Sequence, residues 1–322
     1  MRRRGFLGTV AAAGLAASKE FLDPLAKTSE TSKLNPIPKR RLGKTGADLS
    51  IIALGGIVVM NAEQSHANNV VAEAFDRGIN YFDVAPSYGN AQSRLGPALE
   101  PYRSRSFLAC KTGQRTRDGS AKELEESLRL LRTDHVDLYQ FHGVTTKEDV
   151  TTIFGPNGAM ETFQAARKAG KVRFIGFSAH SVENALSMLD HYNFDTILFP
   201  INFVLFSQAN FGPQILAKAR QKGMGILALK SMAKTTWPEA HKKDHPYSKC
   251  WYQPTALPDE AALALRWTLS QPITAAVPPG EENYFRLAMD VAQKFERLKP
   301  AEEKALLARA QDVEPIFRLA KA

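Results

Sequence analysis

The chain has 322 residues, of which 44% are hydrophobic, and its formal net charge is +9. No apolar run approaches the roughly 20 residues needed to span a bilayer, so we expect no membrane span. Residues 1–41 hold nine Lys or Arg against three acidic residues, and they therefore carry six of the nine net charges. A nucleic-acid-binding protein keeps its positive charge on the folded domain. This distribution argues against nucleic acid as a partner.

The N-terminal residues resemble an export signal. Arg3-Arg4-Gly5-Phe6-Leu7 matches the twin-arginine pattern, and residues 8–17 form a short apolar stretch of small residues. The alternative is a basic terminus with a chance pair of arginines. We expect residues 1–28 to be a twin-arginine signal peptide, read by export machinery and leading to the periplasm. Cleavage follows either Ala17 or Ala26. Residues 29–38, rich in Ser, Thr and Pro, are expected to be a linker.

From residue 39 onward, apolar runs typical of strands alternate with amphipathic stretches typical of helices. Residues 39–50 contain a glycine turn that predicts a short β-hairpin. Eight strands are predicted after it, at residues 51–54, 79–83, 106–111, 136–142, 172–177, 196–200, 226–230 and 273–277. Helices are predicted between them, for example at residues 67–77, 121–132, 161–169, 182–189, 214–222 and 259–269. Ser120 and Glu123 have the spacing of a capping box for the second of these helices.

Eight strands that each precede a helix predict an α/β fold. We expect a parallel sheet closed into a (β/α)8 TIM barrel over residues 39–322, with the N-terminal hairpin as a plug. The alternative is a doubly wound open sheet. Such a sheet usually has a glycine-rich phosphate-binding turn after its first strand, and Leu54-Gly55-Gly56-Ile57 does not complete that fingerprint.

Polar residues stand at three successive strand ends, where a barrel of this kind builds its active site. The second predicted strand ends at Asp83, the third at Lys111 and the fourth at His142, and Tyr88 lies in the loop after Asp83. Each of these residues alone is more often a cap, a solvated strand end or part of the packing. Together, in this order, they predict a proton donor with the groups that tune it.

These positions resemble the motifs of the aldo/keto reductase family. Asn80–Gly89 is similar to the family segment in which a Tyr-Gly pair follows an aspartate, Lys111 matches its strand-end lysine, and His142 closes an Asp-Leu-Tyr-x-x-His run. Arg41–Gly46 resembles the hairpin that closes the bottom of that family's barrel. The resemblance covers residues 39 to about 300. It implies an oxidoreductase that transfers hydride between NADPH and a carbonyl or alcohol substrate, such as an aldehyde, ketone or sugar.

The four residues then take defined roles. Hydride addition to a carbonyl creates an alkoxide that needs a proton, and Tyr88 is the expected donor. The Lys111 ammonium is expected to lower the pKa of Tyr88, and Asp83 to keep the lysine charged. His142 is expected to hydrogen-bond the carbonyl oxygen and orient it.

The cofactor groove matches the family less completely. Ser178 matches the serine that holds the nicotinamide carboxamide, and Asn202 matches an asparagine after the sixth strand. Leu229, followed by Lys230, stands where a tyrosine usually stacks on the nicotinamide, and Ala179 where an asparagine is usual.

The loop and helix after the eighth strand are expected to hold the adenosine phosphates. Gly280 lies in this loop, and Arg286 is the basic residue that a 2′-phosphate requires. NADPH is therefore the expected cofactor. Glu281 and Glu282 leave NADH open, because acidic side chains bind a free 2′-hydroxyl.

Residues 234–254 form an unusually long connection, which we expect to lie over the barrel mouth. Three aromatic residues in it are candidates for substrate contact: Trp237, Trp251 and Tyr252. Packing against the barrel rim is the alternative. His241 and His245 have a zinc-like spacing, but the glutamate of that motif is missing and Pro246 follows, so we expect no metal site.

Function can also be assigned differently from these residues. The departures at Ala179, at Leu198, where a glutamine is usual, and at Leu229 favour a nicotinamide-nucleotide-binding redox sensor or module on the same barrel, without significant turnover. The complete set of Asp83, Tyr88, Lys111 and His142 favours the enzyme. We expect a small-molecule carbonyl substrate and a monomer.

The arginine pair offers a direct test of the export signal. Replacing Arg3 and Arg4 by lysine is expected to retain the protein in the cytoplasm of a bacterium that otherwise exports it, because the pair is the feature that the pathway reads. Fractionation into cytoplasm and periplasm measures the outcome, with Arg2→Lys as the matched control that leaves the pair intact. Periplasmic accumulation of the double-lysine protein would refute the assignment.

Overall fold

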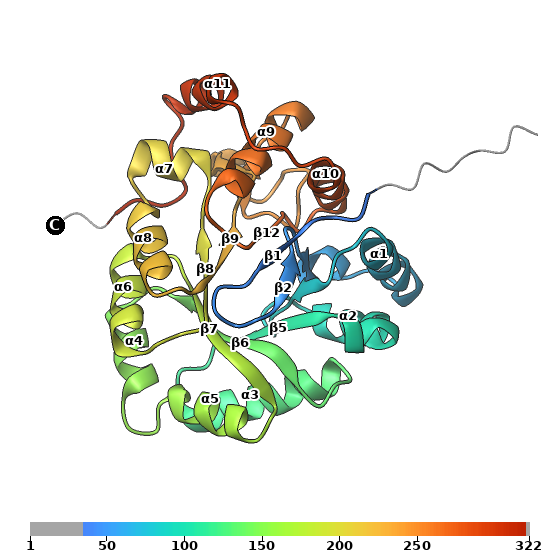
Figure 1. Cartoon of the computed structure of the whole chain (residues 1–322), viewed down its shortest axis with the longest axis vertical. Coiled ribbons are helices and arrows are strands. Elements are labelled where there is room, and N and C mark those ends of the chain that lie inside the picture. Colours follow the sequence, from blue (N-terminus) through green and yellow to red (C-terminus); the bar gives the residue numbers. More distant parts are fainter. Residues whose placement is uncertain (1–34, 320–322) are drawn as a thin grey trace, which may run out of the picture. The chain divides into compact units, whose positions relative to one another are not determined.

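Eight parallel strands form the centre of the fold (Figure 1). They are β3 (Leu54–Gly55), β4 (Tyr81–Asp83), β5 (Phe107–Thr112), β6 (Val136–Val144), β7 (Val172–Ala179), β8 (Thr196–Pro200), β9 (Gly225–Leu229) and β12 (Ala275–Val277). A parallel bridge between Ile52 and Ala276 joins the two ends of the sheet, and the N–H of Ala53 donates to the Ala276 carbonyl at 2.9 Å. The predicted barrel is confirmed, and the open sheet is excluded.

The structure, a computed structural model, describes residues 35–319. The predicted signal peptide lies outside the described residues, as does the predicted linker up to residue 34. The described residues all belong to one compact unit. Its first described residues pack on the barrel, since Ile37 is buried and its N–H donates to the Arg77 carbonyl at 2.9 Å. No helix within residues 35–319 is long and apolar enough to cross a membrane.

Helices surround the barrel (Figure 1). They are α1 (Gln64–Asp76), α2 (Ala91–Leu99), α3 (Arg117–Leu130), α4 (Lys147–Phe154), α5 (Ala159–Lys168), α6 (Val182–His191), α7 (Phe203–Ala209), α8 (Pro213–Gln221), α9 (Pro258–Ser270), α10 (Glu282–Gln293) and α11 (Pro300–Ala310). The predicted capping box at Ser120 is wrong, because α3 begins earlier and is capped by the side chain of Thr116. Glu123 instead accepts a hydrogen bond from the Thr112 hydroxyl at the end of β5.

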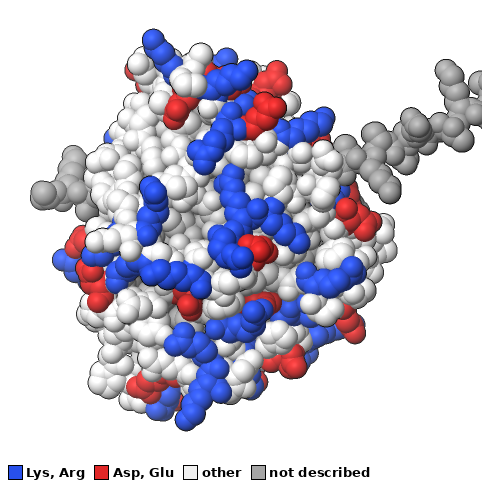
Figure 2. All heavy atoms as spheres, in the orientation of Figure 1, with Lys and Arg blue, Asp and Glu red and all other residues white. Residues whose placement is uncertain are grey.

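An antiparallel hairpin of β1 (Lys39–Arg41) and β2 (Asp48–Ser50) closes one end of the barrel, as predicted (Figure 1). Leu42 is fully buried and packs with side chains of the barrel interior, such as Leu227. The Thr274 hydroxyl, just before β12, donates to the Arg41 carbonyl at 3.0 Å. Figure 2 shows this end of the molecule, where Lys and Arg side chains lie over and around the hairpin with Asp and Glu among them.

Gly43 makes the close approach between hairpin and barrel possible. Its φ is +50°, and a Cβ there would lie 2.3 Å from the backbone nitrogen of Gly225 in β9. Gly46, in the same turn, has a φ of +81° but open space around its Cα. A substitution at Gly43 therefore causes both backbone strain and steric overlap, whereas a substitution at Gly46 causes backbone strain alone.

We predict that Gly43→Ala lowers the free energy of unfolding by about 3 kcal/mol, because left-handed strain and overlap with the barrel backbone add. Gly46→Ala is the matched control and is expected to cost only about 1 kcal/mol, from strain alone. Urea unfolding of the two variants measures the difference. Equal losses of unfolding free energy in the two variants would show that Gly43 is not in close contact with the backbone of β9.

Candidate active site

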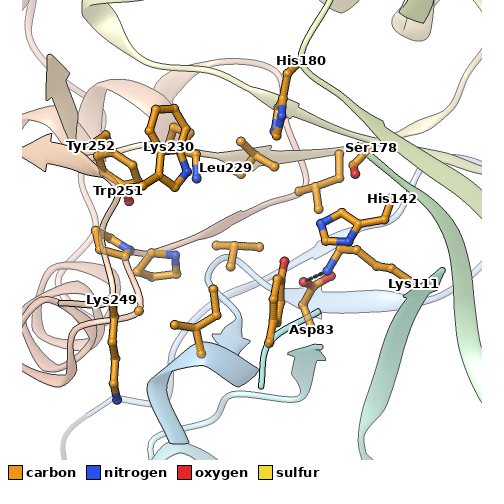
Figure 3. A pocket seen from close by; sticks show the side chains of 17 residues that line it. Asp83, Lys111, His142, Ser178, His180, Leu229, Lys230, Lys249, Trp251 and Tyr252 are labelled. Atoms are coloured by element: carbon orange, nitrogen blue, oxygen red, sulfur yellow. Dashed lines mark hydrogen bonds and ion pairs between the residues drawn. The ribbon is translucent and has the colours of Figure 1, made fainter. Parts of the chain in front are cut away.

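The four residues predicted to be catalytic meet in one cavity at the C-terminal ends of the strands (Figure 3). The cavity has a volume of about 200 Å³. Asp83 ends β4, Lys111 lies in β5 and His142 in β6, and these strands are neighbours in the sheet. Tyr88 comes from the loop that follows β4. The barrel thus brings together side chains that are up to 59 positions apart in the chain.

A buried ion pair lies at the bottom of this site. The Lys111 ammonium donates to one carboxylate oxygen of Asp83, and both side chains are almost fully buried. The other oxygen of Asp83 accepts hydrogen bonds from the Tyr81 hydroxyl and the Gln140 amide, each at 3.3 Å. A buried ion pair is stable only when such additional hydrogen bonds satisfy it.

Tyr81 and Gln140 were not among the residues predicted from the sequence, although their positions in the strands carried a signal. Tyr81 stands two residues before Asp83 in β4, and Gln140 stands two residues before His142 in β6. Side chains two positions apart in a strand point to the same side. Their spacing therefore marked both residues as neighbours of the strand-end groups.

Tyr88 lies beside the ion pair, with its ring centroid 5.1 Å from the Lys111 nitrogen. Burial raises the pKa of Tyr88 above its ordinary value, while the Lys111 ammonium opposes that rise and Asp83 adds to it. The net direction is upward, against the expectation from sequence, because the cost of burying a phenolate exceeds the attraction of the lysine. Tyr88 is therefore protonated at neutral pH and able to donate.

Burial also lowers the pKa of Lys111, but Asp83 and Tyr88 outweigh this effect and raise the pKa above its ordinary value. The lysine therefore stays charged at neutral pH. This agrees with the role that sequence analysis assigned to Asp83.

His142 faces Tyr88 with the two rings nearly perpendicular, at 86°, and their centroids 5.6 Å apart. Burial, with Lys111 as the next cause, lowers the pKa of His142 to about 3, so the ring is neutral at pH 7. The Ser87 hydroxyl lies 3.3 Å from Nδ1. When Ser87 donates to Nδ1, the ring hydrogen is on Nε2, which is then a hydrogen-bond donor.

Arg115, which sequence analysis did not select, fixes the backbone at His142. Its guanidinium donates to the His142 carbonyl at 2.7 Å and to Asp149 at 2.8 Å. Asp149 in turn accepts from the N–H groups of Thr145 and Thr146 at the start of α4. The end of β6 is thus tied to the helix that follows it.

Four of the predicted cofactor residues line the same cavity: Ser178, Leu229, Lys230 and Gly280. Asn202 does not line it. Its side-chain oxygen accepts from the Leu205 N–H at 2.8 Å and so caps α7, and its amide donates to the Lys230 carbonyl at 3.0 Å. Asn202 therefore contacts the site through the backbone of Lys230.

Arg286 lies on α10, outside the cavity lining. Its guanidinium forms ion pairs with Glu73, at 3.0 Å, and with Glu282, at 2.5 Å. A 2′-phosphate bound by this arginine therefore competes with two carboxylates.

The long connection after β9 does reach the barrel mouth. Its ends pair as strands β10 (Ala233–Thr236) and β11 (Tyr252–Pro254), and Trp251 and Tyr252 line the cavity. Trp237 does not line it, because its ring nitrogen donates to the Cys250 carbonyl at 2.9 Å and its ring stacks on His245. Two further lining residues, His180 and Lys249, were not selected from the sequence. No cluster of metal-binding side chains occurs within residues 35–319.

A model of the aldo/keto reductase family matches residues 52–310. The chain belongs to this family. Among curated relatives of this aldo/keto reductase, L-galactose dehydrogenase of Arabidopsis thaliana is 28% identical over 221 residues, which cover 62% of this chain and 67% of the relative. The uncharacterised oxidoreductase YqkF of Bacillus subtilis is 32% identical over 155 residues, covering 44% of this chain and 48% of YqkF. The chain thus spans about half to two thirds of the length of these relatives.

Solved structures confirm the barrel. The aldo-keto reductase AKR11C1 of Bacillus halodurans, in its holo form, superposes with a TM-score of 0.66 at 19% identity, covering 88% of this chain and 99% of that one. At this identity the likeness concerns the fold. The resemblance inferred from sequence is confirmed at the level of the family, and with it the prediction of an oxidoreductase-type enzyme.

The neutral state of His142 is open to direct measurement. We predict that its ring resonances stay constant between about pH 5 and 8, because burial and the Lys111 charge disfavour the imidazolium. Two-dimensional NMR of the histidine rings measures this, with His142→Asn identifying the signal. A titration near the ordinary histidine pKa of about 6.5 would contradict the electrostatics of the site.

Proposed function

We propose that the protein is an NADPH-dependent oxidoreductase that interconverts the carbonyl and alcohol forms of an aldehyde, ketone or sugar. The observation that carries this proposal is the meeting of Tyr88 and His142 in one cavity, beside the buried Lys111–Asp83 pair. Membership of the aldo/keto reductase family supports it. Relatives named L-galactose dehydrogenase and 6-dehydroglucose reductase (the latter from Novosphingobium aromaticivorans, 30% identical over 179 residues, covering 49% of this chain and 57% of the relative) make sugars a reasonable substrate class.

The residues of the site then act in a defined order. A reduced nicotinamide, when bound, supplies the hydride. His142, neutral and donating from Nε2, hydrogen-bonds the carbonyl oxygen and holds it near Tyr88. Tyr88 passes its proton to the alkoxide, so that the carbonyl becomes an alcohol. The Lys111 ammonium stabilises the phenolate that remains, and Asp83 keeps the ammonium in place until solvent returns a proton to Tyr88.

The walls of the cavity fit a nicotinamide ring. Leu198, Leu229 and Val277 offer apolar surface on which a flat ring packs. The Ser178 hydroxyl accepts from the Gly143 N–H at 2.8 Å, which leaves its own hydrogen for a carboxamide oxygen. Gly280 lies at the wall next to Ile57, where a Cβ would lie only 2.3 Å from the Ile57 side chain. For a nicotinamide, Ser178 thus supplies one hydrogen bond, and the other wall residues supply van der Waals contact.

We propose NADPH rather than NADH, with Arg286 holding the 2′-phosphate. The ion pairs of Arg286 with Glu73 and Glu282 must rearrange for this contact. NADH is the second candidate. Glu282 lies beside Arg286, and a carboxylate there can accept a hydrogen bond from the free ribose 2′-hydroxyl of NADH.

A redox sensor without turnover is the second candidate function. Leu229 favours it, because it replaces aromatic stacking on the nicotinamide with aliphatic contact, and Ala179 and Leu198 favour it because they replace the polar asparagine and glutamine usual in the family. The protonated Tyr88 favours the enzyme, since a sensor has no need of a proton donor. Carbonyl-dependent oxidation of NADPH by the purified protein separates the two.

We also propose that residues 1–28 direct the protein to the periplasm. The support is the twin-arginine segment and the concentration of positive charge before residue 42. The twin-arginine pathway transports folded proteins, so the cofactor travels bound.

Tyr88→Phe tests the catalytic assignment. We predict that it lowers kcat by about a hundredfold or more, because one positioned proton donor contributes about that much. The dissociation constant of NADPH is expected to change little. The loss of NADPH absorbance in the presence of an aldehyde measures turnover, and NADPH fluorescence measures binding. Tyr139→Phe is the matched control, since it removes a buried tyrosine hydroxyl of β6 that lies outside the cavity lining and does not contact Asp83 or Lys111. Wild-type turnover of Tyr88→Phe would show that another group donates the proton.

A further inference from the structure

Lys230 is a lysine inside the active-site cavity for which residues 35–319 provide no counter-ion. Its ammonium lies 5.0 Å from the centroid of the Trp251 ring and 4.6 Å from that of Tyr252 (Figure 3). The other two lysines of the cavity are engaged. Lys111 pairs with Asp83, and the Lys249 ammonium donates to the Val58 carbonyl at 2.7 Å.

The backbone of Lys230 is held in a conformation that favours glycine. Its φ is +66°, which few residues other than glycine adopt without strain. Two donors fix its carbonyl, the Asn202 amide and the Ala233 N–H, each at 3.0 Å. Such strain persists only where the surrounding structure imposes it, and it concentrates at functional sites. The fold therefore holds this residue, and its side chain, at the cavity.

The charges around Lys230 leave it unbalanced. Asp83 is the one carboxylate among the described residues that line the cavity, and Lys111 neutralises it. The two lining histidines are neutral at pH 7, because burial lowers the pKa of His142 to about 3 and that of His180 to about 4. A buried cation without an anion is costly, so this arrangement is suited to a ligand that brings the negative charge.

We propose that Lys230, with the rings of Trp251 and Tyr252, forms an anion-binding subsite, and that the substrate is a carbonyl compound bearing a carboxylate or phosphate group. The inference rests on the proposed function, because it assigns the second end of the substrate whose carbonyl meets Tyr88 and His142. The aromatic rings stabilise the ammonium through their faces and leave its hydrogens for anionic oxygens.

The family resemblance predicts that Lys230 is a cofactor residue, but its surroundings point to the substrate. Trp251 and Tyr252 belong to the long connection at the barrel mouth, where sequence analysis expected substrate contact. Burial is the main cause of the lowered pKa of His180, and the charge of Lys230 adds to it. For His142, burial, Lys111, His180 and Arg115 each lower the pKa more than Lys230 does.

A pair of isosteric aldehydes tests the subsite. 4-Carboxybenzaldehyde and 4-nitrobenzaldehyde have planar groups of the same shape, and only the first is anionic. The nitro group activates its aldehyde more strongly towards hydride, so the test compares the ratio of the two kcat/KM values, measured with NADPH, between wild type and variant. In Lys230→Met we expect the ratio to shift against the carboxylate by about tenfold or more, through the KM of the carboxylate, since a charge-assisted hydrogen bond contributes that much. Lys230→Arg retains the positive charge and is expected to retain most of the preference.

Lys249→Met is the matched control, because it removes a lysine of the same cavity whose ammonium is already bonded. It is expected to preserve the ratio. An equal loss of the ratio in Lys249→Met would indicate a general positive field and overturn the subsite. The subsite would also be overturned if Lys230→Met left the ratio unchanged, or if it raised only the KM of NADPH.

Two further arms define the ligand and separate the subsite from catalysis. The first arm compares kcat/KM for glyceraldehyde 3-phosphate with that for glyceraldehyde, and kcat/KM for succinic semialdehyde with that for butanal. The larger of the two ratios identifies phosphate or carboxylate as the preferred anion. If no aldehyde is reduced, the proposed function fails, and calorimetric titration with benzoate decides the subsite alone. A dissociation constant about tenfold weaker in Lys230→Met supports the subsite, and an unchanged constant overturns it.

Discussion

The ion pair between Lys111 and Asp83 is the interaction on which the rest of the site depends. Two charges are removed from water inside the barrel, and their desolvation is offset only because Tyr81 and Gln140 donate to the remaining oxygen of Asp83. These four residues come from β4, β5 and β6, which the sheet places side by side. The pair is therefore a product of the barrel, and its positive end is fixed beside Tyr88.

This field sets the protonation of its neighbours. Burial keeps Tyr88 protonated by raising its pKa, and burial together with Lys111 keeps His142 neutral by lowering its pKa. A proton donor and a neutral hydrogen-bond donor thus face the same space. The chemistry of a carbonyl reductase needs this combination, because the oxygen must be oriented before it is protonated.

The mouth of the barrel adds a second charge. Lys230 leaves β9 with a left-handed backbone, its carbonyl is held by Asn202, and its ammonium lies over Trp251 and Tyr252. Asn202 was matched to the cofactor groove by its position in the sequence, yet in the structure it caps α7 and supports the backbone of Lys230. Motif matching identified an important residue here, while its contacts assign it a supporting role.

The sequence by itself determined the barrel and its hairpin, and it predicted that Asp83, Lys111 and His142 at strand ends and Tyr88 in a loop lie at the same end of the barrel. Local periodicity reports which segments are strands and helices, and strand ends meet at one edge of any parallel barrel. Only the tertiary structure decided the pKa direction of Tyr88, the partners of Asp83, the ion pairs of Arg286 and the burial of Trp237. Each of these depends on residues distant in the chain and on how much water is excluded around them. Desolvation has no signature in local sequence, because it is a property of the packed interior.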